Sequence, residues 1–300
     1  MKNSLLLIDA YSQIFRCFYG VRSLTNSRGE PTNALLPFAR LLLKLRTEFP
    51  AGFGALVFDC GKVQFRMALN PEYKANRPPA PEELKQQIPV IREMASALGW
   101  PLLEEPEYEA DDLIAALATA HGGNVRIISS DKDLVQLVND RITILVPDRK
   151  NGWEVRDPAG ALEKFAVRPD QIIDYLALLG DAADNIPGVR GIGVKTAAEL
   201  LQAHDSVDVM LQNPEIIASE RIRKLLLDGA EIVQRNRDLI RLRRDLPGRF
   251  VSPASCCVLR DPDWNAFRDL VERMELKSLL KEIPEQKPAE PEMFQGDLFG

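Results

Sequence analysis

Two patterns of apolar residues divide the chain. In the first half, short runs of consecutive apolar residues alternate with segments whose apolar residues recur every three or four positions. The runs predict buried strands at residues 4–9, 53–59, 124–131 and 141–147, and the segments predict helices at 10–20, 33–49, 82–98 and 109–120. Nearly continuous apolar strands that alternate with helices are typical of a parallel sheet, so we expect an α/β core.

From about residue 157 the apolar spacing is helical throughout. Asp157 followed by Pro158 predicts a helix start, with Asp as the cap and Pro in the first turn. A glycine-rich turn enters a helix at 188–201, a basic helical stretch covers 220–244, and a last helix covers 264–280. We therefore expect a core over 1–156, a helical region over 157–283, and a flexible tail over 284–300 that begins with the Pro- and Glu-rich segment PEQKPAEPE.

The composition excludes several classes of protein. Hydrophobic residues make up 45% and charged residues 27%, which is typical of a globular chain. The apolar runs, such as Leu5 to Ile8, are too short to span a bilayer, so we expect no membrane partner. The four cysteines form no CxxC pair and there are only two histidines. These counts indicate reduced cytoplasmic thiols and leave carboxylates as the groups that carry any chemistry.

Acidic residues stand at the ends of five apolar elements. Each string has an ordinary interpretation by itself: a favourable helix dipole at 109–112, a helix cap at 131–133, and a turn before Pro187. In a parallel sheet, however, the carboxyl ends of the strands meet at one edge, where so many carboxylates repel unless cations neutralise them. The nine candidates are Asp9, Asp59, Glu109, Asp111, Asp112, Asp131, Asp133, Asp181 and Asp184.

Oxygen ligands of this kind suit Mg²⁺, and two such ions can activate a water and stabilise the leaving oxygen of a phosphodiester. The charge distribution agrees with a polyanionic substrate. The chain has 44 acidic and 38 basic residues, a net charge of −6, but without the nine candidates 35 acids face the same 38 bases. The remaining surface is therefore mildly basic, as a nucleic-acid-binding protein requires.

The longer motifs resemble a known family. The strings LIDAYSQIFRCFYG, EYKANRPP, YEADDLIA, ISSDKDLVQLV and GDAADNIPGVRGIGVKTA stand in the order found in structure-specific 5′ nucleases. That family includes the 5′→3′ exonuclease domain of bacterial DNA polymerase I, the phage 5′ nucleases and the flap endonucleases. The resemblance covers about residues 4–280. It implies a PIN-like core with a helical arch at about 62–100 and a helix-hairpin-helix (helix-3-turn-helix) region at about 186–203. No polymerase follows, so a free-standing version with a separate DNA polymerase is expected.

The resemblance also implies roles for the site residues. Asp9, Asp59, Glu109 and Asp111 would bind one metal ion, with Asp111 facing both ions. Asp131, Asp133 and Asp184 would hold the second, with Asp112 and Asp181 nearby. The ions would be two or three Mg²⁺ or Mn²⁺. Lys74, Arg77 and Arg16 would manage phosphate charge, and Tyr73 would stack on an unpaired base. The alternatives are a solvated basic loop before Pro78 and an ordinary surface arginine at position 16.

Two further segments resemble binding elements. Gly191, Gly193, Lys195 and Thr196 match the helix-hairpin-helix turn, which would contact duplex phosphates through backbone N–H groups and place a K⁺ ion there. The glycine spacing fits neither a dinucleotide-binding motif nor a P-loop. At the other end, Gln295, Leu298 and Phe299 resemble the peptide that binds the bacterial sliding clamp, although Gly296 stands where Leu is usual.

We therefore expect a monomeric 5′→3′ exonuclease and 5′-flap endonuclease of the bacterial cytoplasm, associated with the nucleoid. It would act on branched or nicked DNA and on RNA-primed DNA in replication and repair. The alternative is a clamp-tethered module that binds DNA junctions with little catalysis. A third interpretation, a PIN-type RNA-cleaving nuclease, usually lacks the helix-hairpin-helix region present at 188–203.

Overall fold

The computed structural model describes residues 3–61, 63–148, 150 and 152–284. Its centre is a six-stranded sheet in the order β3-β2-β1-β4-β5-β6, in which only β6 runs antiparallel. The strands are β1 (Leu5–Asp9), β2 (Phe53–Val57), β3 (Leu102–Leu103), β4 (Val125–Ile128), β5 (Ile142–Asp148) and β6 (Gly152–Arg156). The predicted α/β class and four strands are confirmed. β3 and β6 were not predicted, because two residues carry no pattern and GWEVR is mostly polar or half-buried.

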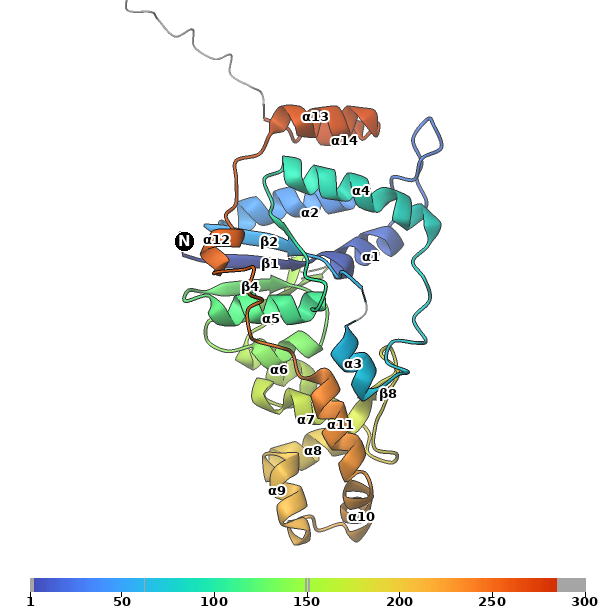
Figure 1. The fold of residues 1–300 in the computed structure, drawn as a ribbon, viewed down its shortest axis with the longest axis vertical. Helices are drawn as coiled ribbons and strands as arrows, with labels where there is room; N and C mark the ends of the chain where they lie inside the picture. Colours follow the sequence, from blue (N-terminus) through green and yellow to red (C-terminus); the bar gives the residue numbers. More distant parts are fainter. Residues whose placement is uncertain (1–2, 62, 149, 151, 285–300) are drawn as a thin grey trace, which may run out of the picture.

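Helices cover both faces of the sheet (Figure 1). Alternate residues of β1 point to opposite faces, and all five are buried, so both faces need a covering layer. Leu6 and Ile8 belong to one apolar cluster, and Leu5 and Leu7 belong to the other. The first cluster contains residues of α1 (Ala10–Gly20), α2 (Leu35–Glu48), α4 (Glu82–Ala97), α13 (Trp264–Arg273) and α14 (Lys277–Leu280). The second contains α5 (Ala110–Ala120) and η1 (Asp133–Leu137).

The helical region shares the second cluster, so core and region form one continuous apolar interior. Asp157 caps α6 as predicted, accepting from the Gly160 N–H at 2.8 Å. The predicted helix at 220–244 is in fact two helices, which meet at Gly229 and end at Ile240. The elements are α6 (Pro158–Phe165), η2 (Pro169–Gln171), α7 (Ile172–Leu179), β7 (Gly180–Asp181), β8 (Ile186–Pro187), α8 (Val194–His204), α9 (Val207–Gln212), η3 (Pro214–Ile216), α10 (Glu220–Asp228), α11 (Ala230–Ile240) and α12 (Pro253–Cys256).

The segment expected to form a helical arch is only partly helical. It consists of α3 (Gln64–Leu69), irregular chain over 70–81, and α4, and the irregular part runs as a long connection in Figure 1. Three prolines precede α4, at positions 78, 79 and 81, which favours extended backbone there. Across the described ranges, no helix is long and apolar enough to cross a membrane.

Candidate active site

The central strands end side by side, and an acidic residue stands at or just beyond each end. Asp9 is the last residue of β1, Asp59 follows β2, and Asp131 follows β4. β1 pairs in parallel with both neighbours, which brings these ends to one edge. The start of α5 joins them, because the Ala110 N–H donates to Asp59 Oδ1 at 2.8 Å. The three acids and Asp111 line one cavity of about 520 Å³.

Asp9 both ends the central strand and caps α1. Its Oδ1 accepts from the Ser12 N–H at 3.1 Å, and its Oδ2 accepts from the Ser129 hydroxyl at 2.7 Å. The residue is only 7% exposed. Burial raises the pKa of Asp9 to about 7, although the hydrogen bonds from Ser129 and Ser12 work in the opposite direction. A cation at this carboxyl group would therefore be needed to keep it fully ionised at neutral pH.

Three further acids share this environment. Burial raises the pKa of Asp111, Asp131 and Asp133, and repulsion from neighbouring carboxylates raises it further. One oxygen each of Asp111 and Asp133, Oδ1 in both, is buried with no hydrogen-bond partner among the described residues. A buried carboxylate oxygen without a donor is costly, and a hard divalent cation is the partner that such oxygens prefer.

The acids do not form a finished ligand set. Over the ranges that the structure covers, no three His, Cys, Asp or Glu side chains are gathered closely enough to hold a metal ion. Glu109 and Asp184 instead contact cationic side chains that line the cavity. By chemistry the residues fit Mg²⁺ or Mn²⁺: the donors are all oxygen, two of the oxygens lack partners, and no soft ligand lines the cavity.

Lys74 and Arg77 supply the cations. Lys74 Nζ lies 2.8 Å from Glu109 Oε2 and 4.0 Å from Asp184 Oδ2, and Arg77 donates to Asp184 Oδ1. Burial opposes the charge on Lys74, but the Glu109 and Asp184 carboxylates outweigh it and the pKa of Lys74 is raised. Both side chains line the acidic cavity, which is where the sequence predicted a group that meets phosphate.

Tyr73 does not occupy the predicted position. Its side chain is buried, at 6% exposure, and its hydroxyl donates to Glu109 Oε2 at 3.1 Å and approaches Asp184 Oδ2 at 3.3 Å. A ring enclosed in this way cannot stack on a DNA base, so that prediction is corrected. Tyr73 instead ties the irregular segment to two candidate metal ligands. Lys74, next to it, adopts a left-handed backbone with φ of 55°, which turns its side chain toward Glu109.

Asp112 also departs from the prediction. Both of its oxygens are occupied, by Arg66 Nη1 at 2.5 Å and Nη2 at 2.8 Å, and its side chain is fully buried. The backbone N–H of Arg243 donates to the same carboxylate at 2.9 Å. Because successive helix residues point about 100° apart, Asp111 faces the cavity while Asp112 faces the interior. Asp112 is therefore not placed as a metal ligand.

Asp184, Asp181 and Arg16 differ in their burial and in their distance from the acidic cavity. Asp184 is buried beside Arg77, whereas Asp181 contacts Lys132 Nζ at 3.2 Å and accepts from the Ala183 N–H at 2.9 Å. Arg16 is exposed on α1 and lines a separate cavity of about 620 Å³, away from the acids. The predicted contact of Arg16 with phosphate inside the acidic cavity does not agree with this position.

The predicted helix-hairpin-helix turn precedes α8. Gly191 adopts φ of 95°, which favours glycine, and a Cβ there would lie 2.9 Å from Leu225 Cδ1, so that this side chain would have to shift. Gly193 caps α8 in open space, and Lys195 and Thr196 follow in the first turn, with the Lys195 side chain 89% exposed. Open backbone N–H groups beside an exposed lysine are suited to a phosphate.

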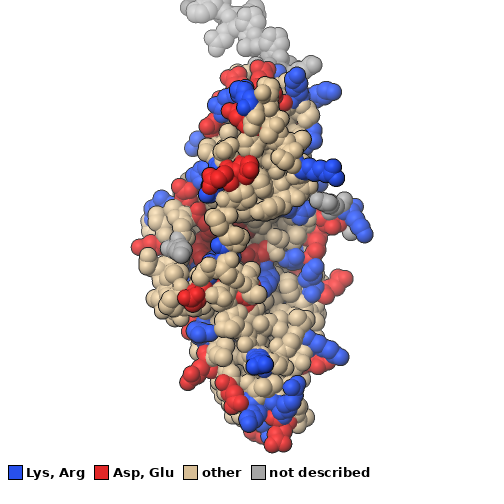
Figure 2. All heavy atoms as spheres, turned by 90° about the vertical axis from the view of Figure 1, so that its right-hand side faces the viewer, with Lys and Arg blue, Asp and Glu red and all other residues tan. Residues whose placement is uncertain are grey.

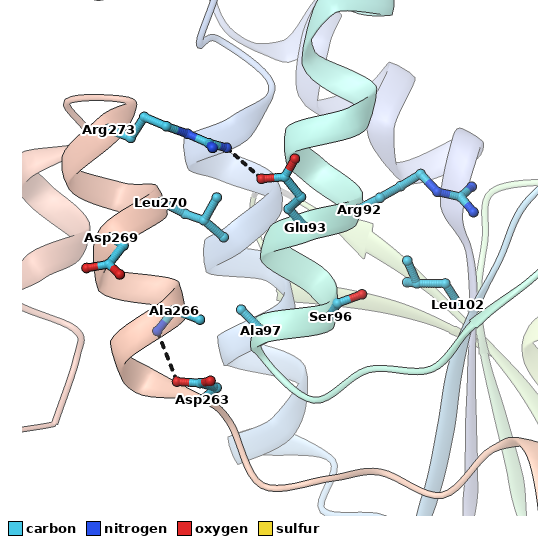
Figure 3. A pocket seen from close by; sticks show the side chains of 10 residues that line it. All are labelled: Arg92, Glu93, Ser96, Ala97, Leu102, Asp263, Ala266, Asp269, Leu270 and Arg273. Carbon is cyan, nitrogen blue, oxygen red and sulfur yellow. Dashed lines mark hydrogen bonds and ion pairs between the residues drawn. The ribbon is translucent and has the colours of Figure 1, made fainter.

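Two views show what lies outside the site. Figure 2 shows basic and acidic side chains interspersed on one face, without a single dominant basic patch. Figure 3 shows another cavity, of about 690 Å³, between α4 and α13. Its ion pair, Arg273 with Glu93 at 2.6 Å, joins the two helices, and none of the candidate acids lines it. The residues Gln295, Leu298 and Phe299 of the predicted clamp peptide lie outside the described residues.

Two kinds of supporting residue carry little signal in the sequence and were not predicted. Ser12 and Ser129 orient Asp9, and the only signal was the serine pair before Asp131. Arg66 carries the buried ion pair, and the only signal was one arginine inside the apolar string QFRMAL.

Comparison with known protein families covers most of the chain. The family described as 5′-3′ exonuclease, N-terminal resolvase-like domain, matches residues 4–166, and 5′-3′ exonuclease, C-terminal SAM fold, matches residues 167–263. A 5′-3′ exonuclease of Aquifex aeolicus is 39% identical over 285 residues, covering 93% of this chain and 95% of the relative. The thermostable DNA polymerase I of Thermus thermophilus is 38% identical over 285 residues, covering 94% of this chain. The chain spans 33% of that polymerase's length.

Solved structures share the fold. The T5 5′-exonuclease with bound zinc superposes with a TM-score of 0.67 at 23% identity, covering 94% of this chain and 100% of the other. The catalytic core of Rad2 in complex with a DNA substrate superposes with a TM-score of 0.64 at 19% identity, covering 94% and 93%. At these identities the likeness concerns the fold alone.

Proposed function

The chain belongs to the 5′-3′ exonuclease family, and we propose that its carboxylate cavity hydrolyses DNA phosphodiesters with two Mg²⁺ or Mn²⁺ ions. One observation carries the proposal: acids from separate elements, Asp9, Asp59, Asp111 and Asp131, line one cavity, and the buried Oδ1 of Asp111 has no hydrogen-bond partner among the described residues. The T5 5′-exonuclease has been solved with divalent zinc, and the T5 D15 flap endonuclease with DNA and metal ions, which supports the same metal class here.

The side chains have two proposed roles: acidic residues bind the metal ions, and Lys74 contacts the phosphate. Asp9, Asp111, Asp131 and Asp133 would hold the ions, because a bound cation offsets the desolvation and the mutual repulsion that raise the pKa of these carboxyl groups. When bound, the ions would supply a polarised water and stabilise the leaving oxygen. Lys74 keeps a positive charge in the cavity, where it can pass from Glu109 to an entering phosphate.

Arg77 has the same role nearer the rim, because its side chain is half exposed while its partner Asp184 is buried. A phosphate that displaces Asp184 from Arg77 would exchange one anion for another at the same guanidinium group. The ion pairs seen here are therefore the contacts that substrate would replace.

The substrate proposed is 5′-flap, nicked or RNA-primed DNA, with duplex phosphates at the turn before α8 and K⁺ bound there. The open space around Gly193 at the start of α8 and the exposed Lys195 support this part, because the first N–H groups of a helix have no partner within the helix. We further propose that the protein acts as a monomer in the bacterial cytoplasm.

The sliding clamp is the proposed partner of the tail. Deleting residues 295–300 should abolish clamp binding and leave cleavage of a short flap unchanged. Unchanged clamp affinity after the deletion would remove this partner and would not affect the nuclease proposal.

The nuclease proposal is tested with a 5′-labelled flap duplex in Mg²⁺, Mn²⁺ or Ca²⁺. Cleavage at the flap base is expected with Mg²⁺ and Mn²⁺ only, and Asp111→Asn should lose it while still binding the flap in Ca²⁺. Tight binding by the unmodified protein without cleavage would refute the proposal and favour a DNA-junction-binding module.

A further inference from the structure

A buried ion pair lies directly behind the carboxylate cavity. Arg66 of α3 is 1% exposed, and its guanidinium group donates hydrogen bonds to both carboxylate oxygens of Asp112 in the first turn of α5. Arg66 Nε also donates to the Leu239 carbonyl at 2.9 Å. One side chain thus joins α3, the helix that carries Asp111, and the end of α11.

The same pair contacts both the side chain and the backbone of Glu109. Arg66 Nη1 lies 3.3 Å from Glu109 Oε2, and the Glu109 backbone N–H donates to Asp112 Oδ2 at 3.3 Å. The Asp112 carboxylate also accepts from the Arg243 N–H, at 2.9 Å. Every described polar neighbour of Asp112 is therefore a donor that fixes the first turn of α5, and none belongs to the cavity.

We propose that Arg66 and Asp112 are positioning residues that fix the first turn of α5, and with it Asp111, where a divalent cation binds. The inference rests on the proposed metal-dependent function and extends it to residues outside the cavity. Stability alone is a weak reason for such a pair, because well-packed apolar residues often replace a buried ion pair at little cost. A fork that fixes the orientation of neighbouring ligands explains why charge is kept at this position.

The direction in which Arg66→Met changes the affinity for a divalent cation distinguishes a positioning role from a purely electrostatic one. Arg66 places a positive charge 3.3 Å from Glu109. If charge were its only effect, Arg66→Met would remove repulsion toward an incoming cation and tighten metal binding. Tighter binding would also follow if Asp112 were itself a ligand, because the substitution would release its carboxylate. Positioning predicts the opposite, since the first turn of α5 would lose its anchor.

The experiment measures Mn²⁺ affinity of the folded full-length protein by isothermal titration calorimetry. Arg66→Met, Asp112→Asn, and the two combined should each bind Mn²⁺ about 10- to 100-fold more weakly, the range seen when outer partners of metal ligands are removed. The combined variant leaves no unpaired buried charge and keeps an oxygen for the Arg243 N–H, so it carries the test if a single variant fails to fold.

A matched control comes from the helical region. Arg237 lies 2.6 Å from Asp174, with exposures of 9% and 11%, in a buried pair that does not contact the cavity. Arg237→Met should lower thermal stability and leave Mn²⁺ affinity within twofold. Tighter or unchanged Mn²⁺ binding in folded Arg66→Met would overturn the inference. Mn²⁺ binding without cleavage by the unmodified protein would instead refute the proposed function alone.

Discussion

Replacing Asp9 should stabilise the metal-free protein while removing a candidate ligand. The folded protein holds the Asp9 proton up to a pKa of about 7, whereas the unfolded chain releases it near 3.8. As pH rises from about 4 to 7, the unfolded chain ionises first, so the free energy of unfolding falls. The stability contributed by the raised pKa is fully present below pH 4 and is lost above pH 7.

The size of the effect follows from the difference in pKa. A difference of about 3 corresponds to ~4 kcal/mol at pH 8 and, with only part of it developed, ~2 kcal/mol at pH 5. Asp9→Asn removes this penalty and keeps an oxygen for the Ser12 N–H. The variant should therefore be more stable than the unmodified protein in EDTA, and more so at pH 8.

Urea unfolding in EDTA at pH 5 and pH 8 measures the free energy of unfolding of both proteins and so tests the prediction directly. Asp140→Asn, at an exposed acid outside the cavity, is the control and should change little at either pH. Adding Mn²⁺ should stabilise the unmodified protein and have less effect on Asp9→Asn. An Asp9→Asn protein that is less stable than the unmodified one at pH 8 in EDTA would refute the reasoning.

Three further substitutions test other parts of the account. Lys74→Met should reduce kcat for flap cleavage by about 10²- to 10³-fold with little change in KM, and an unchanged kcat would show that Lys74 does not meet the reacting phosphate. Gly191→Ala should cost about 1–2 kcal/mol in thermal unfolding, because φ of 95° and the contact with Leu225 both oppose a Cβ, and equal stability would contradict the described turn. Arg77→Ala should weaken cleavage less than Lys74→Met, because Arg77 is half exposed, and the reverse order in single-turnover assays would contradict the assignment.

The elements that carry a strong local pattern could be predicted from sequence. The central strands are continuous apolar runs, and Asp157 with Pro158 marks a helix start that the structure confirms. β3 could not be predicted, because two residues become a strand only through pairing with β2. The break at Gly229 was hidden inside a basic helical stretch whose overall periodicity continues across it.

The candidate site shows a similar division. Motif position correctly placed Asp9, Asp59, Asp111 and Asp131 along one cavity, since parallel strands share a carboxyl edge. Motif position could not separate Asp111 from Asp112, because adjacent residues on a helix differ only in the direction they face. That direction depends on Arg66, which lies 46 positions earlier in the chain. Long-range partners of this kind leave no local signal.

The proposed function requires that the carboxylate cavity binds the catalytic metal ions. Anomalous diffraction at the manganese edge, from crystals soaked in Mn²⁺, locates those ions without assuming any activity. The account predicts anomalous peaks within ligand distance of Asp9, Asp111, Asp131 and Asp133, with Asp112 still paired to Arg66. Peaks only elsewhere, or a cavity without manganese at saturating Mn²⁺, would contradict it.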